Sequence, residues 1–266
     1  MMGMSSMVID WYEYRQEWMR KSDEVIVEAG VSIFVNGVEI STLMCSPQEQ
    51  DYLALGFLKS EGFLTELAEI DHLHTSEDGC CVDVWLTHEI QLPERRIVTS
   101  GCGDGVTFRD PAEDVDPLPD GEPVNPEVLF ALFNRLHRPD SLHVRARGVH
   151  TSGLADGNEL LFVTEDVGRH NTIDKLLGYC LSHGIETRGR TLLTTGRVSS
   201  EMLRKGAMMG CPIIASRNSP TSMSVEMARA WNIALAGYVR RNSMRVYAHP
   251  ERLGCRESSI VSTSNE

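Results

Sequence analysis

The sequence contains no long apolar run. No stretch approaches the roughly 20 apolar residues that cross a bilayer, and the opening segment MMGMSSMVIDWYEYRQEWMRKSDE lacks the apolar part of a signal peptide. We therefore expect a cytoplasmic protein with no membrane partner. Basic residues are also scarce, because 25 lysines and arginines stand against 38 aspartates and glutamates, for a formal net charge of −13. A surface this acidic disfavours nucleic acid as a partner but still permits a local basic pocket for a phosphorylated ligand.

Paired cysteines are missing as well. The seven cysteines are odd in number and irregularly spaced, which argues against a disulfide framework and fits a reducing compartment. No Cys-x-x-Cys pair occurs, so we predict neither a thioredoxin-type dithiol nor a metal site. The remaining composition, 41% hydrophobic and 24% charged over 266 residues, is that of a globular protein with one large domain or two smaller ones.

The order of the patterns predicts an α/β protein, α+β overall, built from two domains. Residues 23–108 are expected to form a small N-terminal α+β domain that ends in a glycine-rich active-site loop. Residues 109–123 are acidic and proline-rich, which is typical of an exposed linker. Residues 124–254 alternate strands and helices, which predicts a largely parallel or mixed sheet covered by helices. Residues 255–266 are expected to form a flexible tail.

Local signals position several elements. Asn36-Gly37 lies between two β-rich runs and predicts a hairpin. Ser46-Pro47-Gln48-Glu49 has the pattern of a capping box and predicts a helix that ends near Gly62. Asn125 and Asn171 each precede an apolar stripe and are expected to cap helices.

Cys102 is the candidate nucleophile. It lies in Gly101-Cys102-Gly103-Asp104-Gly105, directly after a predicted strand at residues 96–100, and glycines there permit a tight turn that leaves the sulfur accessible. Backbone N–H groups of such a loop stabilise a thiolate, whereas Asp104 opposes it. A lone cysteine is more often a small buried hydrophobe, so residue type alone leaves both interpretations open.

Three polar loops follow predicted strands and lead into predicted helices. They comprise residues 165–171, 194–200 and 216–221. Ligands bind at this edge of an open α/β sheet, where helix N-termini favour anions. The loops contribute Arg169, Arg197 and Arg217, whose guanidinium groups suit phosphate. Helix capping explains any one of these loops, but three in succession predict a site for an anionic ligand.

Four runs occur in an order that resembles the FdhD/NarQ family of formate dehydrogenase accessory proteins. They are EDVGRHNTIDKLLG, TTGRVSSEM, GCPIIASRNSPTS and VYAHPERL, and the resemblance covers roughly residues 25–253. It implies that the second domain is a cytidine-deaminase-like three-layer α/β/α domain lacking the zinc site, and that the protein is a homodimer. The zinc signature His-x-Glu is indeed absent, because His150 is followed two positions later by Ser152.

The resemblance also implies a function. Proteins of this family act as sulfurtransferases that accept sulfur as a cysteine persulfide from a cysteine desulfurase. They pass it to the Mo-bis(molybdopterin guanine dinucleotide) cofactor, a bound substrate that formate dehydrogenase then uses, and they hold no permanent metal. The persulfide cysteine of the family matches Cys102. The segment that contacts the guanine dinucleotide matches, by position, Tyr238, Val239, Arg240, Arg241, Asn242 and Ser243.

The active loop departs from the family pattern at one position. The best-known members carry Cys-x-x-Cys there, whereas Gly105 stands in place of the second cysteine. One hypothesis is a carrier that uses the single sulfur of Cys102. The alternative is a non-catalytic chaperone that holds the molybdenum cofactor for formate dehydrogenase. A nucleotide-metabolising enzyme with a deaminase-like fold is a third hypothesis, and it lacks the metal ligands.

Overall fold

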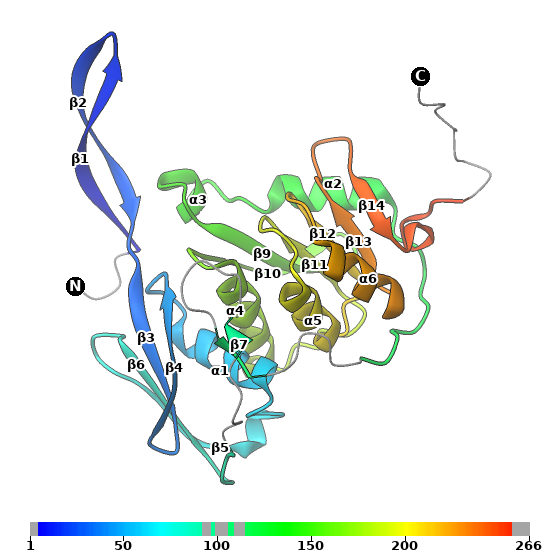
Figure 1. Cartoon of the computed structure of the whole chain (residues 1–266), viewed down its shortest axis with the longest axis horizontal. Coiled ribbons are helices and arrows are strands. Elements are labelled where there is room, and N and C mark those ends of the chain that lie inside the picture. The colour runs from blue at the N-terminus through cyan, green and yellow to red at the C-terminus, as the bar shows by residue number, and fades with distance from the viewer. Residues whose placement is uncertain (1–4, 92–96, 99–105, 109–114, 257–266) are drawn as a thin grey trace. The chain divides into compact units, whose positions relative to one another are not determined.

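The computed structural model describes residues 5–91, 97–98, 106–108 and 115–256 (Figure 1). In this described part the chain is a mixed α/β protein with several sheets and six α-helices. Contacts divide it into two compact units, which interleave along the chain. The first unit comprises residues 1–110, 137–152 and 163–186, and the second comprises residues 111–136, 153–162 and 187–266. No helix in the described ranges is both long and apolar enough to cross a membrane.

A four-stranded sheet forms the centre of the first unit. Its strands, in the order β4-β3-β6-β5, are Val38–Cys45, Ala29–Val35, Cys81–Leu86 and Ile70–Thr75. The predicted hairpin is confirmed, because Asn36 and Gly37 adopt φ angles of 50° and 77° between β3 and β4. Alternate side chains of β3 (Val31, Ile33 and Val35) are buried in a common core, as expected for a sheet that buries one face.

Helices α1 (Gln50–Glu61) and α4 (Arg169–Ser182) pack together through glycines. A Cβ atom placed on Gly56 would lie 1.8 Å from the backbone oxygen of Asp174, and one on Gly178 would lie 1.9 Å from that of Tyr52. The two helices therefore approach as closely as their backbones allow, and α4 belongs to the first unit. The two contact-based units do not follow the predicted bounds of 23–108 and 124–254, because each unit is assembled from separate stretches of the chain. The predicted domains therefore stay a prediction.

Alanine at either glycine should separate these helices. We expect Gly56→Ala and Gly178→Ala each to lower the free energy of unfolding by at least about 3 kcal/mol, because a backbone carbonyl cannot move aside as a side chain can. The control is Gly30→Ala, where the added Cβ would meet only side-chain atoms at 3.6 Å. Urea unfolding measures all three, and equal stability of the Gly56→Ala and Gly30→Ala variants would contradict the packing described here.

Two predicted helix caps are wrong. The N-cap of α1 is Glu49, in a left-handed conformation without a side-chain cap, and Ser46 Oγ instead accepts a hydrogen bond from the backbone N–H of Val167. The N-cap of α4 is Gly168, and the Asn171 side chain instead donates to the Met44 carbonyl. In both cases a residue with capping chemistry is used by a partner more than 100 positions away in the sequence.

A six-stranded sheet runs through the second unit in the order β10-β9-β11-β12-β13-β14, and the two units share β9 and β10. Its strands are β9 (His150–Asp156), β10 (Glu159–Asp166), β11 (Thr191–Thr194), β12 (Ile213–Ser216), β13 (Ala234–Gly237) and β14 (Arg245–Ala248). Strands β11, β12 and β13 are parallel and β14 is antiparallel to β13, which confirms the predicted mixed sheet.

The helices of the second unit begin where the sequence predicted. They are α2 (Pro126–Arg135), α5 (Ser200–Met208) and α6 (Ser222–Ala230). The side chains of Asn125, Ser199 and Thr221 each accept a hydrogen bond from a backbone N–H of the first turn. A 3-10 turn, η2 (Pro250–Leu253), follows β14.

The remaining elements of the first unit are small or extended. Helix α3 (Leu142–Arg145) and the 3-10 turn η1 (Leu67–Glu69) are single turns, and β7 (Ile97–Val98) pairs with β8 (Val106–Thr107). Strands β1 (Ser6–Arg15) and β2 (Glu17–Ile26) form a two-stranded antiparallel ribbon (Figure 1) that the sequence did not predict.

Candidate functional site

Cys102 lies outside the described residues, so its role stays a prediction. The described ends of its loop are strands β7 and β8, which pair in antiparallel fashion with Ile97 opposite Thr107. This agrees with the predicted strand before Cys102 as far as the structure describes it.

The strand after the glycine-rich loop is fixed to the end of α1. Glu61, the last residue of α1, is buried, and its carboxylate accepts hydrogen bonds from Thr107 Oγ1 at 2.9 Å and from the Phe108 backbone N–H at 2.8 Å. The rings of Phe63 and Phe108 meet edge to face with centroids 5.3 Å apart. The end of β8 is therefore held by a buried carboxylate and an aromatic contact.

Buried cysteines are poor nucleophiles in this protein. Burial, aided by the charge of Asp166, raises the pKa of the Cys45 thiol to about 12, and burial raises the pKa of Cys180 to about 11. Cys211 is also buried. A thiol with a raised pKa supplies little thiolate at neutral pH, so Cys45 and Cys180 are poor nucleophiles.

The loop between β10 and α4 is organised around one buried carboxylate. Asp166 Oδ1 accepts hydrogen bonds from the Gly168 N–H at 2.7 Å and from Asn171 Nδ2 at 2.8 Å. Its Oδ2 accepts one from the Ser46 N–H at 3.0 Å and pairs with Lys175 Nζ at 2.8 Å, with both charged side chains fully buried. All of these partners belong to the first unit. Asp166 therefore fixes the path of this predicted loop, and its carboxylate is saturated by donors.

Replacing Lys175, the cation of the buried pair with Asp166, should destabilise the protein. We expect Lys175→Met to lower the free energy of unfolding by about 3–5 kcal/mol, because it leaves the Asp166 carboxylate buried without its counter-ion. The matched control is Arg190→Met, which breaks a partly exposed pair with Asp156 and should cost less than about 1 kcal/mol. Chemical unfolding gives both free energies. A loss of stability below about 1 kcal/mol for Lys175→Met would contradict this prediction, because it would mean that the buried Asp166 carboxylate does not need its counter-ion.

His150 and Ser152 are the residues that the sequence analysis compared with the His-x-Glu signature of zinc deaminases. Burial, together with the charge of Arg169, lowers the pKa of His150. Ser152, at the position where the signature requires glutamate, is buried and its hydroxyl lies 2.6 Å from that of Thr172. No carboxylate is available at this position to activate water.

In the second unit the structure brings two of the three predicted loops together. The Arg217 N–H donates to the Thr194 carbonyl at 3.0 Å, and the Val198 N–H donates to the Ser219 carbonyl at 3.1 Å. Ser216 Oγ donates to the Gly196 carbonyl at 2.6 Å. Loops 194–200 and 216–221 therefore share one edge of the sheet, at the carboxyl ends of β11 and β12. Loop 165–171 belongs to the first unit.

The predicted cofactor segment joins the same edge. The Val239 N–H donates to the Ser216 carbonyl at 2.9 Å, and the Tyr238 N–H donates to the Asn218 carbonyl at 3.2 Å. Tyr238 has a φ of 52°, a strained value for an aromatic residue, and the Arg245 guanidinium lies 4.4 Å from the centre of its ring. Residues 240–243 continue as an exposed turn.

Arg217 and Arg240 are brought together at this edge. Arg217 is half-buried, stacks 5.1 Å from the Phe133 ring centre, and donates to the carbonyls of Phe133 at 3.1 Å and Val239 at 3.3 Å. Arg240 Nη1 donates to the Arg217 carbonyl at 2.6 Å. Burial and the neighbouring positive charge of Arg240 both lower the pKa of Arg217. The sequence had assigned these two arginines to separate segments.

No carboxylate balances these two arginines in the described part of the chain. Among the described residues, Arg217 and Arg240 hydrogen-bond only to backbone carbonyls and take part in none of the ion pairs. Two guanidinium groups held close together repel each other unless an anion lies between them. Their fork-shaped donors suit a phosphate or diphosphate. This is the chemistry expected of an anionic ligand site in an otherwise acidic protein.

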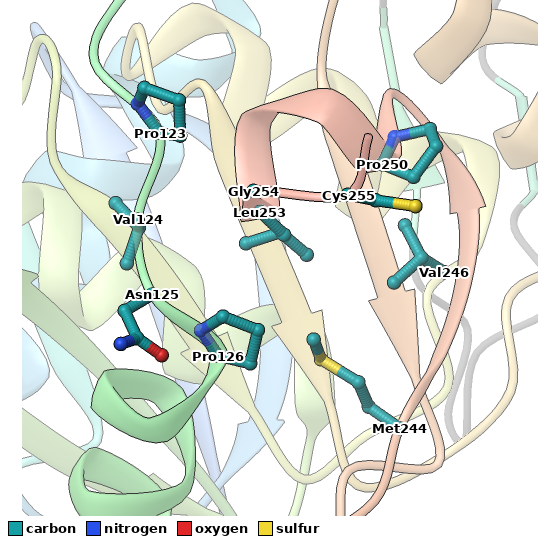
Figure 2. Close-up of a pocket in the computed structure, with 10 residues that line it drawn as sticks. All are labelled: Pro123, Val124, Asn125, Pro126, Met244, Val246, Pro250, Leu253, Gly254 and Cys255. Atoms are coloured by element: carbon teal, nitrogen blue, oxygen red, sulfur yellow. The ribbon is translucent and has the colours of Figure 1, made fainter. Parts of the chain in front are cut away.

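A separate pocket of about 570 Å³ lies between the start of α2 and the β14–η2 region (Figure 2). Its lining residues are Pro123, Val124, Asn125, Pro126, Met244, Val246, Pro250, Leu253, Gly254 and Cys255. None of them carries a charged side chain, so this pocket does not suit a diphosphate. The arginine pair remains the candidate site for an anion.

The described part of the chain is a mixed α/β protein with two neighbouring arginines, Arg217 and Arg240, beyond the carboxyl ends of β12 and β13. The FdhD/NarQ family matches residues 26–254, and the chain belongs to that family. The sulfur carrier protein FdhD of Bacillus subtilis (strain 168) is 34% identical over 253 residues, which covers 92% of this chain and 97% of that protein. The sulfur carrier protein FdhD of Staphylococcus haemolyticus is 31% identical over 245 residues, covering 90% and 93%.

A solved structure of similar fold supports the same family assignment. The crystal structure of a protein assigned as a formate dehydrogenase accessory protein from Desulfotalea psychrophila matches with a TM-score of 0.76 at 26% identity, covering 93% of this chain and 99% of that one. The comparisons therefore confirm the family that the four sequence runs indicated, over nearly the whole chain.

Proposed function

We propose that this protein is a sulfur carrier that matures formate dehydrogenase. Cys102 accepts sulfur from a cysteine desulfurase as a persulfide and transfers it to the Mo-bis(molybdopterin guanine dinucleotide) cofactor, which is bound as substrate. The family membership and the names of the relatives support the carrier role. The observation that carries the cofactor-binding part is the arginine pair, Arg217 and Arg240, held together with no carboxylate partner among the residues that the structure describes.

The chemistry at Cys102 is thiol exchange. The Cys102 thiolate attacks the outer sulfur of the desulfurase persulfide, the bond between the two donor sulfurs breaks, and the donor cysteine leaves as a thiolate. Small neighbours, Gly101 and Gly103, leave room for a bulky acceptor to approach the new terminal sulfur. Because Gly105 replaces a second cysteine, no neighbouring thiol in this loop resolves the persulfide by forming a disulfide.

The cofactor is anchored through its charged tail. The segment Tyr238–Ser243 binds the guanine dinucleotide, with Arg240 on its diphosphate. Arg217 adds a second guanidinium to the same anion, which relieves the repulsion between the two cations. Anchoring at a distance from the metal makes sulfur delivery directional. We further propose a cytidine-deaminase-like three-layer α/β/α domain around this anchor, and a cytoplasmic homodimer.

Labelled sulfur tests the carrier role. The full chain is incubated with a cysteine desulfurase and cysteine labelled in its sulfur, separated, and then mixed with sulfur-free cofactor and formate dehydrogenase. A carrier should first hold the label and then lose it as enzyme activity appears. The rival hypothesis, a chaperone that only binds the cofactor, predicts no label on the chain together with unchanged cofactor affinity. That outcome would overturn the proposal.

A further inference from the structure

Glu61 is a buried carboxylate at a position where a helix disfavours one. It is the last residue of α1 and is 5% exposed. The carboxyl end of a helix carries partial negative charge, so a carboxylate there is opposed by the helix dipole as well as by the loss of hydration. Gly62 ends the helix directly after it, with a φ of 82°. A glutamate at this place therefore needs hydrogen-bond donors from another part of the fold.

Those donors come from β8 and the residue after it. Thr107 Oγ1 lies within hydrogen-bonding distance of both carboxylate oxygens of Glu61, at 2.9 and 3.2 Å, and the Phe108 N–H donates to Oε2 at 2.8 Å. Both donor residues are buried, and hydrogen bonds to a charged acceptor are stronger than those between neutral groups. We call these three residues, Glu61, Thr107 and Phe108, the β8 clamp.

The helix that bears Glu61 is fixed in turn to α4 within the first unit. Gly56 lies so close to the Asp174 backbone that no side chain fits between them. Ser60, the residue before Glu61, donates from its buried hydroxyl to Asp174 Oδ1 at 3.0 Å. Because a close-packed interior transmits displacements rather than absorbing them, the clamp ties the position of β8 to that of the α1–α4 pair.

Strands β7 and β8 need such an anchor. They form a sheet of their own with two residue pairs, Ile97 with Thr107 and Val98 with Val106. A two-stranded sheet is at best marginally stable by itself in water. The β7–β8 pairing therefore depends on the attachment of β8 to α1, and the clamp fixes both strands at once.

We propose that Glu61 is a positioning residue for sulfur transfer at Cys102 and acts through β8. In the sequence, three residues separate Cys102 from Val98 on one side and from Val106 on the other. Such a length of chain spans at most about 14 Å, so the two described strands limit where the thiol meets the sulfur donor. The inference rests on the proposed carrier function and adds to it a residue that is 41 positions away in the sequence.

Positioning has a signature that simple stabilisation lacks. Transfer from a desulfurase persulfide requires the two sulfur atoms to meet in one orientation, and a misplacement of about 1 Å lowers the rate of such a step by about 100-fold. Iodoacetamide is small and approaches a thiol from many directions, so its rate depends on thiolate content and access instead. A lost positioning residue should therefore slow uptake of sulfur from the desulfurase and leave alkylation unchanged.

The test compares these two rates on the peptide that contains Cys102. Glu61→Met keeps the length of the side chain but accepts no hydrogen bond. It should lower the rate of labelled sulfur uptake by about 10- to 100-fold, with iodoacetamide alkylation within about twofold of wild type. Glu61→Gln should restore uptake to within about threefold, because its amide oxygen accepts from the Phe108 N–H and the Thr107 hydroxyl turns to accept from its amide nitrogen.

Two further variants separate the clamp from general damage to the end of α1. Ser60→Ala removes the neighbouring buried hydroxyl and leaves the clamp in place, so uptake should stay within about twofold of wild type. Thr107→Val removes one donor of the clamp with little change of shape, and should lower uptake by about 3- to 10-fold. Circular dichroism checks folding, and Thr107→Val decides the matter if Glu61→Met does not fold.

The outcomes distinguish this inference from the carrier function. A wild-type protein that takes up no sulfur would contradict the carrier function, and the inference with it. Uptake by wild type together with an equal rate in the folded Glu61→Met or Thr107→Val protein would overturn the inference alone. A parallel fall of uptake and alkylation would also overturn it, because the thiol would then have lost its accessibility rather than its position.

Discussion

A Cys102→Ala variant is expected to abolish formate dehydrogenase activity in a strain that lacks the native protein, to the level of the deletion itself. The reason is that the proposed mechanism stores sulfur at one atom, and Gly105 supplies no second thiol in the loop. The buried alternatives, Cys45 and Cys180, have pKa values raised to about 12 and about 11 and supply little thiolate. Enzyme activity in cell extracts measures the effect.

The matched controls are the cysteines that lie outside the core. Cys80→Ala and Cys255→Ala each remove an exposed thiol and should leave maturation at the wild-type level. Cofactor binding by the Cys102→Ala protein should also be unchanged, because the proposed anchor lies at other residues. Full maturation by Cys102→Ala would remove the carrier hypothesis and leave the chaperone.

The second large effect is expected at the arginine pair. We expect Arg240→Ala to weaken binding of guanosine diphosphate, a probe for the guanine dinucleotide end of the cofactor, by about 10- to 100-fold. A charge-assisted hydrogen bond contributes about 1.5–3 kcal/mol, and 1.4 kcal/mol corresponds to a factor of ten. Arg240 is exposed, so its loss should not unfold the protein. Isothermal titration calorimetry measures the affinity.

The control for this effect is Arg188→Ala, an exposed arginine in the connection that precedes β11. It removes the same charge at the opposite end of that strand and should change the affinity less than about twofold, because exposed charges are screened at this range. Arg217→Lys provides a further comparison, since lysine keeps the charge but loses the fork of donors. Equal affinities of wild type and Arg240→Ala would contradict the anchor.

Elements with strictly local signals could be predicted from the sequence. The β3–β4 hairpin follows from Asn36-Gly37, because that pair favours the left-handed turn that joins twisted strands. The starts of α5 and α6 follow from Ser199 and Thr221, whose hydroxyls bond within their own first turn. The mixed sheet follows from the alternation of strands and helices.

Elements set by distant partners could not be predicted. Ser46 and Asn171 have capping chemistry, but their side chains bond instead to Val167 and Met44, far along the chain. The close approach of α1 and α4 depends on Gly56 fitting against Asp174, which no spacing within one helix reveals. The β1–β2 ribbon was missed for another reason, since its strands pair only with each other and bury little.

Some features of the candidate site could likewise be predicted from the sequence, and others depend on contacts between distant residues. The sequence placed loops 194–200 and 216–221 at one sheet edge, and the backbone hydrogen bonds between them confirm this. The approach of Arg240 to Arg217 needed the three-dimensional order of β12 and β13. Phe133 and Arg245 were missed because their contacts lie across elements. Cys102 and its thiol chemistry stay a prediction from the sequence and the family.

Peptide mass spectrometry after desulfurase treatment tests the central claim most directly. The full chain is incubated with a cysteine desulfurase and cysteine, digested without reductant, and searched for added sulfur. We predict one extra sulfur atom on the peptide that contains Cys102, and none on any peptide of the Cys102→Ala protein. A wild-type protein without added sulfur, or with sulfur only at another cysteine, would contradict the account.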